Sequence, residues 1–398
     1  MSIKRKIVSY VAALALAATS AVSFTGCADV SYALVIDGES IPAGVYILYS
    51  GYALNDAESK LAEEQPDLDT SAEDFDYYAQ TVSGMSFADY VRQETVNYCK
   101  RYVAVNRMYD ELGITPDAAQ RETVNDNIND QWDYSVSSWT SYLTYLKGFS
   151  TLGDYYQSIG VAKSSYKEVM MGTVKESEIF SYYYGEGGIE EVPKDEIEKY
   201  IADNYTLARY FSISLYNDEG DVIEDKDELK VLEDLANSYV DDLNGGASYS
   251  EIYEKYEKYF SDGEDKDGEE HEHEDSDFDR IIGVEATSPS EEFVKALFKQ
   301  DTGTAALFKA DTYYYVVQRL DITENDEYVE DYTDIALDAL RSDDLDGVLE
   351  GKYVGYAVTE NNNAPDYARQ QATSARDGLT TISSIQYYNY YSSLFSSY

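Results

Sequence analysis

The chain has 398 residues and a formal net charge of -47 at pH 7. This length suits two domains, because single hydrophobic cores usually stop growing near ~250 residues. The acidic balance excludes a protein built to bind nucleic acid, since phosphate recognition needs clustered lysine and arginine, and it disfavours electrostatic attachment to anionic lipid. We interpret the charge as a solvated acidic surface, with a specific basic client as the alternative.

The first residues have the features of an export signal. Basic residues 4–6 precede an apolar stretch over 7–22, which is shorter than the roughly 20 residues of a membrane-spanning helix. The stretch ends in Phe-Thr-Gly-Cys27, which resembles a bacterial lipobox, although leucine is usual where Phe24 stands. The resemblance implies removal of residues 1–26 and a lipid on Cys27, and hence a lipoprotein on the extracytoplasmic face of the cell membrane. The alternative is an ordinary secretory signal with an incidental cysteine.

Cys99 is the other cysteine of the chain. With Cys27 lipidated, no intrachain disulfide is possible. Cys99 shares a helical stripe with Val91, Thr95 and Val103, and this spacing predicts a buried apolar side chain without a redox role.

The region over 27–190 is predicted to be mostly helical. It opens with a short apolar strand, an Asp37-Gly38 turn and a second short segment. The predicted helices span Val45 to Leu54, 87–112 with Ser86 as N-cap and Gly113 as stop, a segment that begins at Thr115-Pro116, and 163–184, with a polar loop near 65–72.

A change of character after the glycines at 185, 187 and 188 predicts a second domain over 191–322. Its predicted elements are, in order, a strand over 207–216, helices over 226–243 and 249–260, an acidic loop over 261–279, a strand over 280–284, a helix over 290–303 and a strand over 312–320. The order strand, helices, strand, helix, strand predicts an α+β fold.

The first and last strands of this domain show a clear period of two. The first has Phe211, Ile213 and Leu215 on one face and Tyr210, Ser212 and Ser214 on the other. The last has Tyr313, Tyr315, Val317 and Arg319 on one face and Tyr314, Val316, Gln318 and Leu320 on the other. Such alternation is typical of strands with two different faces.

The C-terminal part divides into two segments. Residues 323–363 predict one or two helices and an extended segment, which we expect to complete the helical domain. Residues 364–398 form a low-complexity tail, rich in serine and tyrosine, for which we predict only partial order.

Several segments together resemble a known family. They are 35–49, 102–124, 192–215, 244–256 and 293–303, the last with Phe293, Ala296, Phe298 and Gly303 at the family spacing. They resemble the PrsA and SurA group of extracytoplasmic foldases, in which a parvulin-type peptidyl-prolyl isomerase domain is set into a helical chaperone domain. The resemblance implies a helical chaperone domain, a parvulin-like domain over 191–322, and unfolded or newly secreted polypeptides as partners.

The resemblance also implies positions for an active site. Parvulins usually carry one histidine in the first strand and another in the last strand, and these positions correspond to Ser212 and Tyr315. The histidines of this chain, His271 and His273, lie instead in the acidic loop. Both family histidines are therefore replaced in the strands.

The resemblance places an aromatic pocket beside these two positions. It implies Phe293 as the pocket aromatic, and we expect Tyr210 and Tyr313 to contact substrate with it. Prolyl isomerisation breaks no covalent bond, so hydrogen bonds from Ser212 and Tyr315 in an apolar pocket can supply part of the rate. We therefore expect weak or absent isomerase activity on a retained client-binding cleft, without cofactor or metal.

The acidic loop needs comparison with metal sites. If Gly263 is position one of a calcium loop, then Asp265, Asp267, Gly268 and Glu274 fall at EF-hand positions three, five, six and twelve. Position one requires a carboxylate, however, and the two histidines do not form a zinc-protease pattern. We interpret the segment as a solvated loop without a metal.

The 42 tyrosines are unusual in number. Each one suits a half-buried face, and the excess suits adaptable contacts with polypeptide clients or stacking on sugars. Three classes of function remain open: a parvulin-like foldase enzyme, a non-catalytic holdase of the same architecture, and a surface lipoprotein that binds a ligand or partner.

Overall fold

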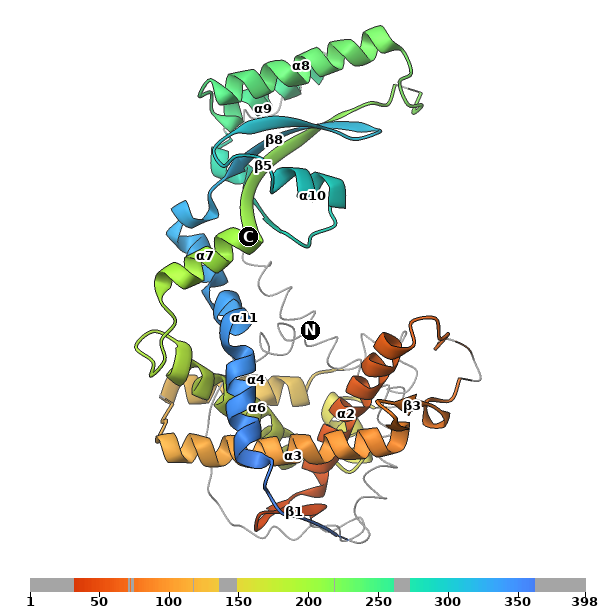
Figure 1. The fold of residues 1–398 in the computed structure, drawn as a ribbon, viewed down its shortest axis with the longest axis vertical. Coiled ribbons are helices and arrows are strands. Elements are labelled where there is room, and N and C mark those ends of the chain that lie inside the picture. Colours follow the sequence, from red (N-terminus) through yellow and green to blue (C-terminus); the bar gives the residue numbers. More distant parts are fainter. Residues whose placement is uncertain are drawn as a thin grey trace. The chain divides into compact units, whose positions relative to one another are not determined.

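The computed structural model describes residues 32–70, 72, 75–116, 118–135, 149–217, 219–260 and 273–361. The chain divides into two compact units, of which unit 1 comprises Met1–Glu191 with Asp338–Tyr398 and unit 2 comprises Val192–Leu337. Figure 1 labels several elements of each unit. The export signal, Cys27, the acidic loop over 261–272 and the tail over 364–398 lie outside the described residues.

A small sheet joins distant parts of unit 1. Strands β1 (Leu34–Ile36) and β2 (Glu39–Ile41) form a hairpin, and β9 (Val358–Glu360) pairs with the other side of β1. Asp37 and Gly38 have φ values of 50° and 91°, as a two-residue hairpin turn with two left-handed positions requires. The predicted turn is thus confirmed.

Helices make up most of unit 1. They are α2 (Ala43–Glu64), α3 (Phe87–Leu112), α4 (Ala118–Trp132), α5 (Leu152–Ser158) and α6 (Lys163–Tyr184), and the short elements η2 (Tyr77–Ala79), β3 (Thr81–Val82) and β4 (Met85–Ser86) lie between α2 and α3. The ends of α3 were predicted correctly: the Ser86 hydroxyl accepts a hydrogen bond from the backbone N–H of Asp89, and Gly113 is left-handed with φ 64°.

Three predicted helix boundaries were wrong, and one of them is the end of the helix predicted over 290–303, because α10 spans only Glu291–Leu297. Helix α2 continues to Glu64 because Ala57 and Leu61 extend its buried stripe by further turns, although polar residues surround them in the sequence. Helix α4 is described from Ala118, and the Thr115 hydroxyl contacts the carbonyl oxygen of Gly113 at 3.4 Å.

The core of unit 1 contains Cys99 and many tyrosines. Cys99 is fully buried, which raises the pKa of its thiol and confirms the predicted apolar role. Trp132 stacks on Tyr156 with ring centroids 5.6 Å apart, and Tyr166 packs against both rings. Many tyrosines therefore pack the interior.

The segment over 323–363 forms one long helix and a strand. Helix α11 (Asp326–Tyr353) is continuous, and β9 follows it. Basic side chains of α3 bind this segment: Arg101 contacts Asp346 at 2.6 Å, and Arg92 pairs with Glu360. In a third ion pair the basic residue is on α11 instead: Lys352 of α11 contacts Glu111 of α3 at 2.8 Å.

Unit 2 is built on an antiparallel sheet. Its elements are α7 (Lys194–Asn204), β5 (Tyr205–Ser214), α8 (Lys226–Asn244), α9 (Tyr249–Phe260), η5 (Asp275–Phe278), β6 (Arg280–Gly283), α10 (Glu291–Leu297), β7 (Ala305–Lys309), β8 (Tyr313–Leu320) and η6 (Ile322–Glu324). The strand order is β6-β5-β8-β7. The fold class of the protein is α+β, as predicted.

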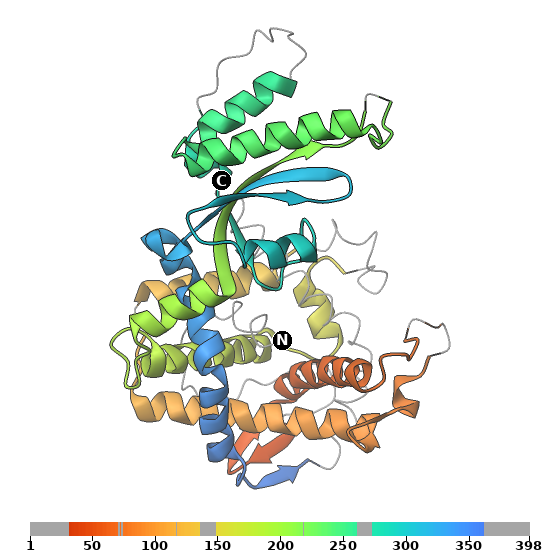
Figure 2. The same cartoon turned by 45° about the horizontal axis from the view of Figure 1, so that its top comes forward.

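The sheet of unit 2 is covered on both faces. Helices α8 and α9 lie on one face and α10 lies on the other (Figures 1 and 2). Phe211 and Ile213 belong to the core under α8 and α9, whereas Tyr210 packs with the α10 side, so the predicted faces are confirmed. Strand β7 was not predicted, because its two alanines give little apolar alternation.

No helix among the described residues is long and apolar enough to cross a membrane.

The contacts of Arg101 lead to a stability prediction. Its guanidinium, with 21% of the side chain exposed, binds both carboxylate oxygens of Glu176 and one of Asp346. Arg101→Ala should lower the free energy of unfolding by about 2 kcal/mol, because charge-assisted hydrogen bonds are lost in a partly buried place. Urea unfolding followed by tryptophan fluorescence measures this, since both tryptophans belong to unit 1.

Lys60→Ala is the matched control. Lys60 forms a solvent-exposed pair with Glu63, and its loss should leave the free energy of unfolding nearly unchanged. Equal effects of the two substitutions would contradict the role given to Arg101.

Candidate functional site

Ser212 and Tyr315 face each other across the two central strands of unit 2. They are direct cross-strand partners in the antiparallel ladder of β5 and β8. Cross-strand partners point to the same face of a sheet, which here is the face covered by α10. The two residues predicted at the family histidine positions are therefore adjacent in space.

Aromatic side chains surround this pair. Tyr210, Phe293, Phe308 and Tyr315 are called the aromatic group below. Phe293 lies centrally, with ring-centroid distances of 5.1 Å to Tyr210, 5.3 Å to Tyr315 and 5.4 Å to Phe308. Tyr313 flanks the group, 6.0 Å from Tyr315. All five residues that were predicted for the site thus lie together.

Phe308 is the member of the group that the sequence interpretation missed. It lies on β7 opposite Tyr315. Leu307 belongs to the α8 side of the sheet and Phe308 to the α10 side, so the period of two was present in the sequence. The signal was too short to identify a strand without knowledge of its neighbour.

Helix α10 is fixed at both ends, and it holds Phe293 in place. The Ser290 hydroxyl accepts a hydrogen bond from the backbone N–H of Phe293 at 3.1 Å, as an N-cap does. At the other end, Arg319 of β8 donates to the carbonyl oxygens of Phe298 and Gln300 at 3.0 and 2.6 Å. The chain then turns into β7 at Gly303, whose φ of 81° favours glycine.

Burial divides the aromatic group into a base and an accessible part. Phe293 is only 1% exposed. Tyr210, Phe308 and Tyr315 are partly buried, so they remain in reach of a bound chain. Phe293, the expected pocket aromatic, therefore forms the base of the group. Its ring contacts keep the rings of Tyr210, Phe308 and Tyr315 in place.

The hydroxyl groups of the site are neutral hydrogen-bonding groups. Burial, followed by the neighbouring Tyr313 and Tyr210, raises the pKa of Tyr315 above its usual value. Tyr315 therefore keeps its proton at neutral pH. Within the described part of the chain, neither the Tyr315 nor the Ser212 hydroxyl has a hydrogen-bond partner, so both are available to a ligand.

The site has no histidine among the residues that the structure describes. His273 lies near Tyr253 and Phe278, with ring-centroid distances of 5.9 and 5.5 Å. These rings belong to the core on the α8 and α9 side of the sheet. His271 lies outside the described residues.

The segment that follows the acidic loop is tied to β5. Arg209 contacts Asp275 at 2.9 Å and Asp279 at 2.6 Å, and the Tyr328 hydroxyl donates to Asp279 at 3.2 Å. The prediction of an acidic loop over 261–279 is thus wrong for its last residues, because Asp275–Phe278 form the 3-10 helix η5. In the described ranges, no cluster of three or more His, Cys, Asp or Glu side chains could hold a metal ion.

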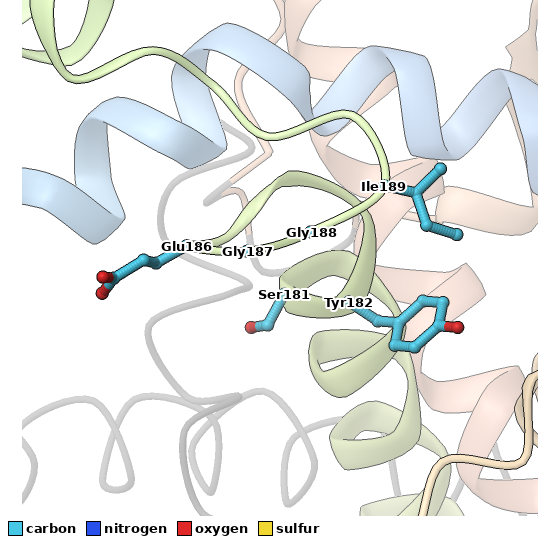
Figure 3. A pocket seen from close by; sticks show the side chains of 6 residues that line it. All are labelled: Ser181, Tyr182, Glu186, Gly187, Gly188 and Ile189. Carbon is cyan, nitrogen blue, oxygen red and sulfur yellow. The ribbon is translucent and has the colours of Figure 1, made fainter.

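A separate hollow of about 270 Å³ lies at the end of α6 in unit 1. Its lining consists of Ser181, Tyr182, Glu186, Gly187, Gly188 and Ile189. The side chains of Tyr182, Glu186 and Ile189 point in different directions and do not converge on a common point (Figure 3). We assign no binding role to this hollow.

Comparison with known proteins gave structural likenesses only. No protein-family model matches the sequence, and no curated protein matches it significantly. Two similar solved structures are foldase proteins. One is the foldase PrsA of Lactococcus lactis, with a TM-score of 0.33, 13% identity, and coverage of 86% of this chain and 98% of that chain.

The other is the foldase PrsA of Streptococcus pneumoniae, with a TM-score of 0.27, 11% identity, and coverage of 71% of this chain and 84% of that chain. Both TM-scores are below 0.5, and neither likeness decides what the site does.

The burial difference within the aromatic group gives a prediction. Phe293→Ala should lower the free energy of opening of the β5 and β8 amides by about 3 to 4 kcal/mol, because a buried ring leaves a cavity. Phe308→Ala should lower it by only about 1 to 2 kcal/mol, since that ring is partly exposed. Native-state hydrogen exchange of these strands measures both. A larger effect at Phe308 would show that the base of the group has been misassigned.

Proposed function

We propose that this protein is an extracytoplasmic, lipid-anchored folding factor that binds non-native polypeptides at the aromatic group, with weak or absent prolyl-isomerase activity. The observation that supports this most is the pairing of Ser212 with Tyr315 inside the aromatic group. It combines apolar rings with neutral hydroxyl groups on one face of a rigid sheet.

Binding of a client follows from the chemistry of these side chains. Tyrosine and phenylalanine rings give large contact areas with few rotatable bonds, and a tyrosine hydroxyl adds a hydrogen bond without a charge. An unfolded segment offers apolar side chains and peptide carbonyl groups. The Ser212 and Tyr315 hydroxyls can donate to such carbonyls, while the rings cover the apolar side chains.

Weak catalysis follows from the same arrangement. The rotation barrier of a prolyl bond is ~18 to 20 kcal/mol, and an enzyme lowers it by binding the twisted amide more tightly than the planar amide. Phe293 is covered, and the Tyr315 ring lies against it. These contacts favour a binding surface over a deep proline pocket, which makes a holdase the second candidate function.

The location is proposed from the first residues of the chain. The basic start, the apolar stretch and Phe-Thr-Gly-Cys27 together support export and lipid attachment. A single-membrane bacterium with an exposed outer leaflet suits a client-binding protein that meets newly secreted chains.

A protease-coupled assay on proline peptides tests the catalytic part. The wild-type protein should show turnover at least about tenfold below that of a histidine-containing parvulin, because the preorganised hydrogen bonds of the histidine pair are missing. It should nevertheless suppress aggregation of an unfolded secreted protein. Tyr315→His should raise turnover, since it restores one family histidine opposite Ser212.

Tyr313→His is the matched control, because Tyr313 lies on the same strand and face but opposite Ser214. It should raise turnover less than Tyr315→His does, because it places no imidazole opposite Ser212. Wild-type turnover equal to that of a histidine-containing parvulin would contradict the weakened site, and failure of both assays would favour a ligand-binding surface lipoprotein.

Metabolic labelling tests the lipid anchor. When the full chain is produced in a bacterial host with an alkyne-bearing palmitate, the membrane fraction should contain labelled protein. Cys27→Ala should abolish the label and leave an unprocessed or soluble product. An unlabelled wild-type protein released into the medium would instead indicate an ordinary secretory signal.

A further inference from the structure

Strand β7 forms an open edge of the sheet in unit 2. It is the last strand in the order β6-β5-β8-β7, and no described strand pairs with its other side. In an antiparallel ladder, the backbone groups of successive residues alternate between the partner strand and the outside. The outward residues therefore present free N–H and C=O groups to an additional strand.

Hydrogen bonds identify the outward residues. The carbonyl oxygen of Thr304 accepts from the N–H of Arg319 at 3.0 Å, and the N–H of Ala310 donates to Tyr313 at 2.8 Å. The backbone N–H and C=O groups of the even-numbered residues of this stretch thus point to β8 and hydrogen-bond with it. Ala305, Leu307 and Lys309 face outward.

The protein itself already places an amide at the first outward position. The side chain of Asn244, the last residue of α8, donates to the carbonyl oxygen of Ala305 at 2.9 Å and accepts from its N–H at 2.8 Å. These are the two bonds that the peptide groups of a neighbouring strand would make. In the described structure, the backbone groups of Leu307 and Lys309 have no comparable partner.

We propose that Leu307 and Lys309 bind an extended segment of a client polypeptide as an added strand, with its apolar side chains against Phe308 and Tyr315. This inference rests on the proposed client-binding function and defines the backbone conformation of the client. Main-chain hydrogen bonds of this kind are insensitive to sequence, which suits a protein that binds many unfolded chains.

The charges around the edge favour a basic client over a second copy of this chain. Asp301 and Asp311 are exposed on either side of β7. The net charge of -47 opposes self-association. A lysine on an edge strand would normally repel a basic segment. Here the Lys309 ammonium group forms an ion pair with Glu233 at 2.6 Å, which offsets its positive charge. The matching client is an apolar extended stretch with basic residues at its ends.

The strand geometry predicts which client amides are essential. A client residue opposite Leu307 exchanges hydrogen bonds with it, and its side chain points to the α8 face where Leu307 packs. A client residue opposite Phe308 points its side chain to the aromatic group, and its own N–H points away from β7. Apolar contact and backbone pairing therefore use alternate residues of the client.

N-methylated peptides test this alternation on the wild-type protein. The probe is a fluorescent peptide of alternating threonine and valine with two lysines at each end, and its binding is measured by fluorescence anisotropy. Methylation of the threonine amides should weaken binding about tenfold or more, because these amides face β7 when the valines cover the aromatic group. Methylation of the valine amides should leave the affinity within about threefold of the parent peptide. Equal affinities of the two methylated peptides would overturn strand addition.

A protein variant provides a second measurement. Leu307→Pro removes the outward N–H but leaves the ladder with β8, and proline is tolerated at such edge positions. Leu307→Ala keeps the N–H, so the difference between the two variants isolates that hydrogen bond. The proline variant should bind the parent peptide about tenfold more weakly than the alanine variant, with equal hydrogen-exchange protection of β8 in both.

The outcomes separate this inference from the function on which it rests. If both methylated peptides bind like the parent and Phe308→Ala weakens all three, client binding at the aromatic group stands and strand addition is wrong. If the parent peptide does not bind at all, both are wrong.

Discussion

The register of the β5–β8 ladder determines most of what unit 2 can do. It pairs residues from Leu207 with Leu320 through to Ser214 with Tyr313. A slip by one residue would turn every side chain of one strand to the opposite face. The core under α8 and α9 would then receive serine, and the aromatic group would lose Tyr210 or Tyr315. The site and the hydrophobic core therefore depend on the same set of backbone hydrogen bonds.

Scarce positive charges connect the elements around this framework. The chain has 30 lysines and arginines against 77 aspartates and glutamates. Several arginines bind two or more partners each: Arg101 binds Glu176 and Asp346, Arg209 binds Asp275 and Asp279, and Arg319 binds the carbonyl groups that end α10. A planar guanidinium suits this role better than lysine, because its donors are fixed in direction. Most acidic side chains among the described residues are exposed or partly exposed.

Local signals made much of this structure predictable from the sequence. The caps of α3, the Asp37-Gly38 turn and the alternation in β5 and β8 depend on nearby residues, and all were found. The adjacency of Ser212 and Tyr315 also followed, but only through resemblance to a family. The two hydroxyl positions could not have been singled out by residue type alone.

Features that depend on distant residues were missed. The burial of Phe293 results from three rings on three strands, and the binding of Asn244 to the edge of β7 joins residues far apart in the chain. Strand β7 is too short and too weakly alternating to be predicted from its own sequence, and it is identified only by its pairing with β8. Helix α2 was predicted too short because Ala57 and Leu61 lie among polar residues and are buried only by their neighbours in space.

The raised pKa of Tyr315 has a consequence for the surroundings in which the site can work. A histidine changes its charge between about pH 5 and 8, so a histidine pair binds differently as the medium becomes acidic. Serine does not titrate there, and burial moves the ionisation of Tyr315 still further from this range. The hydroxyl pair of Ser212 and Tyr315 thus keeps the same protonation across the range of acidity in which a histidine pair would change its charge.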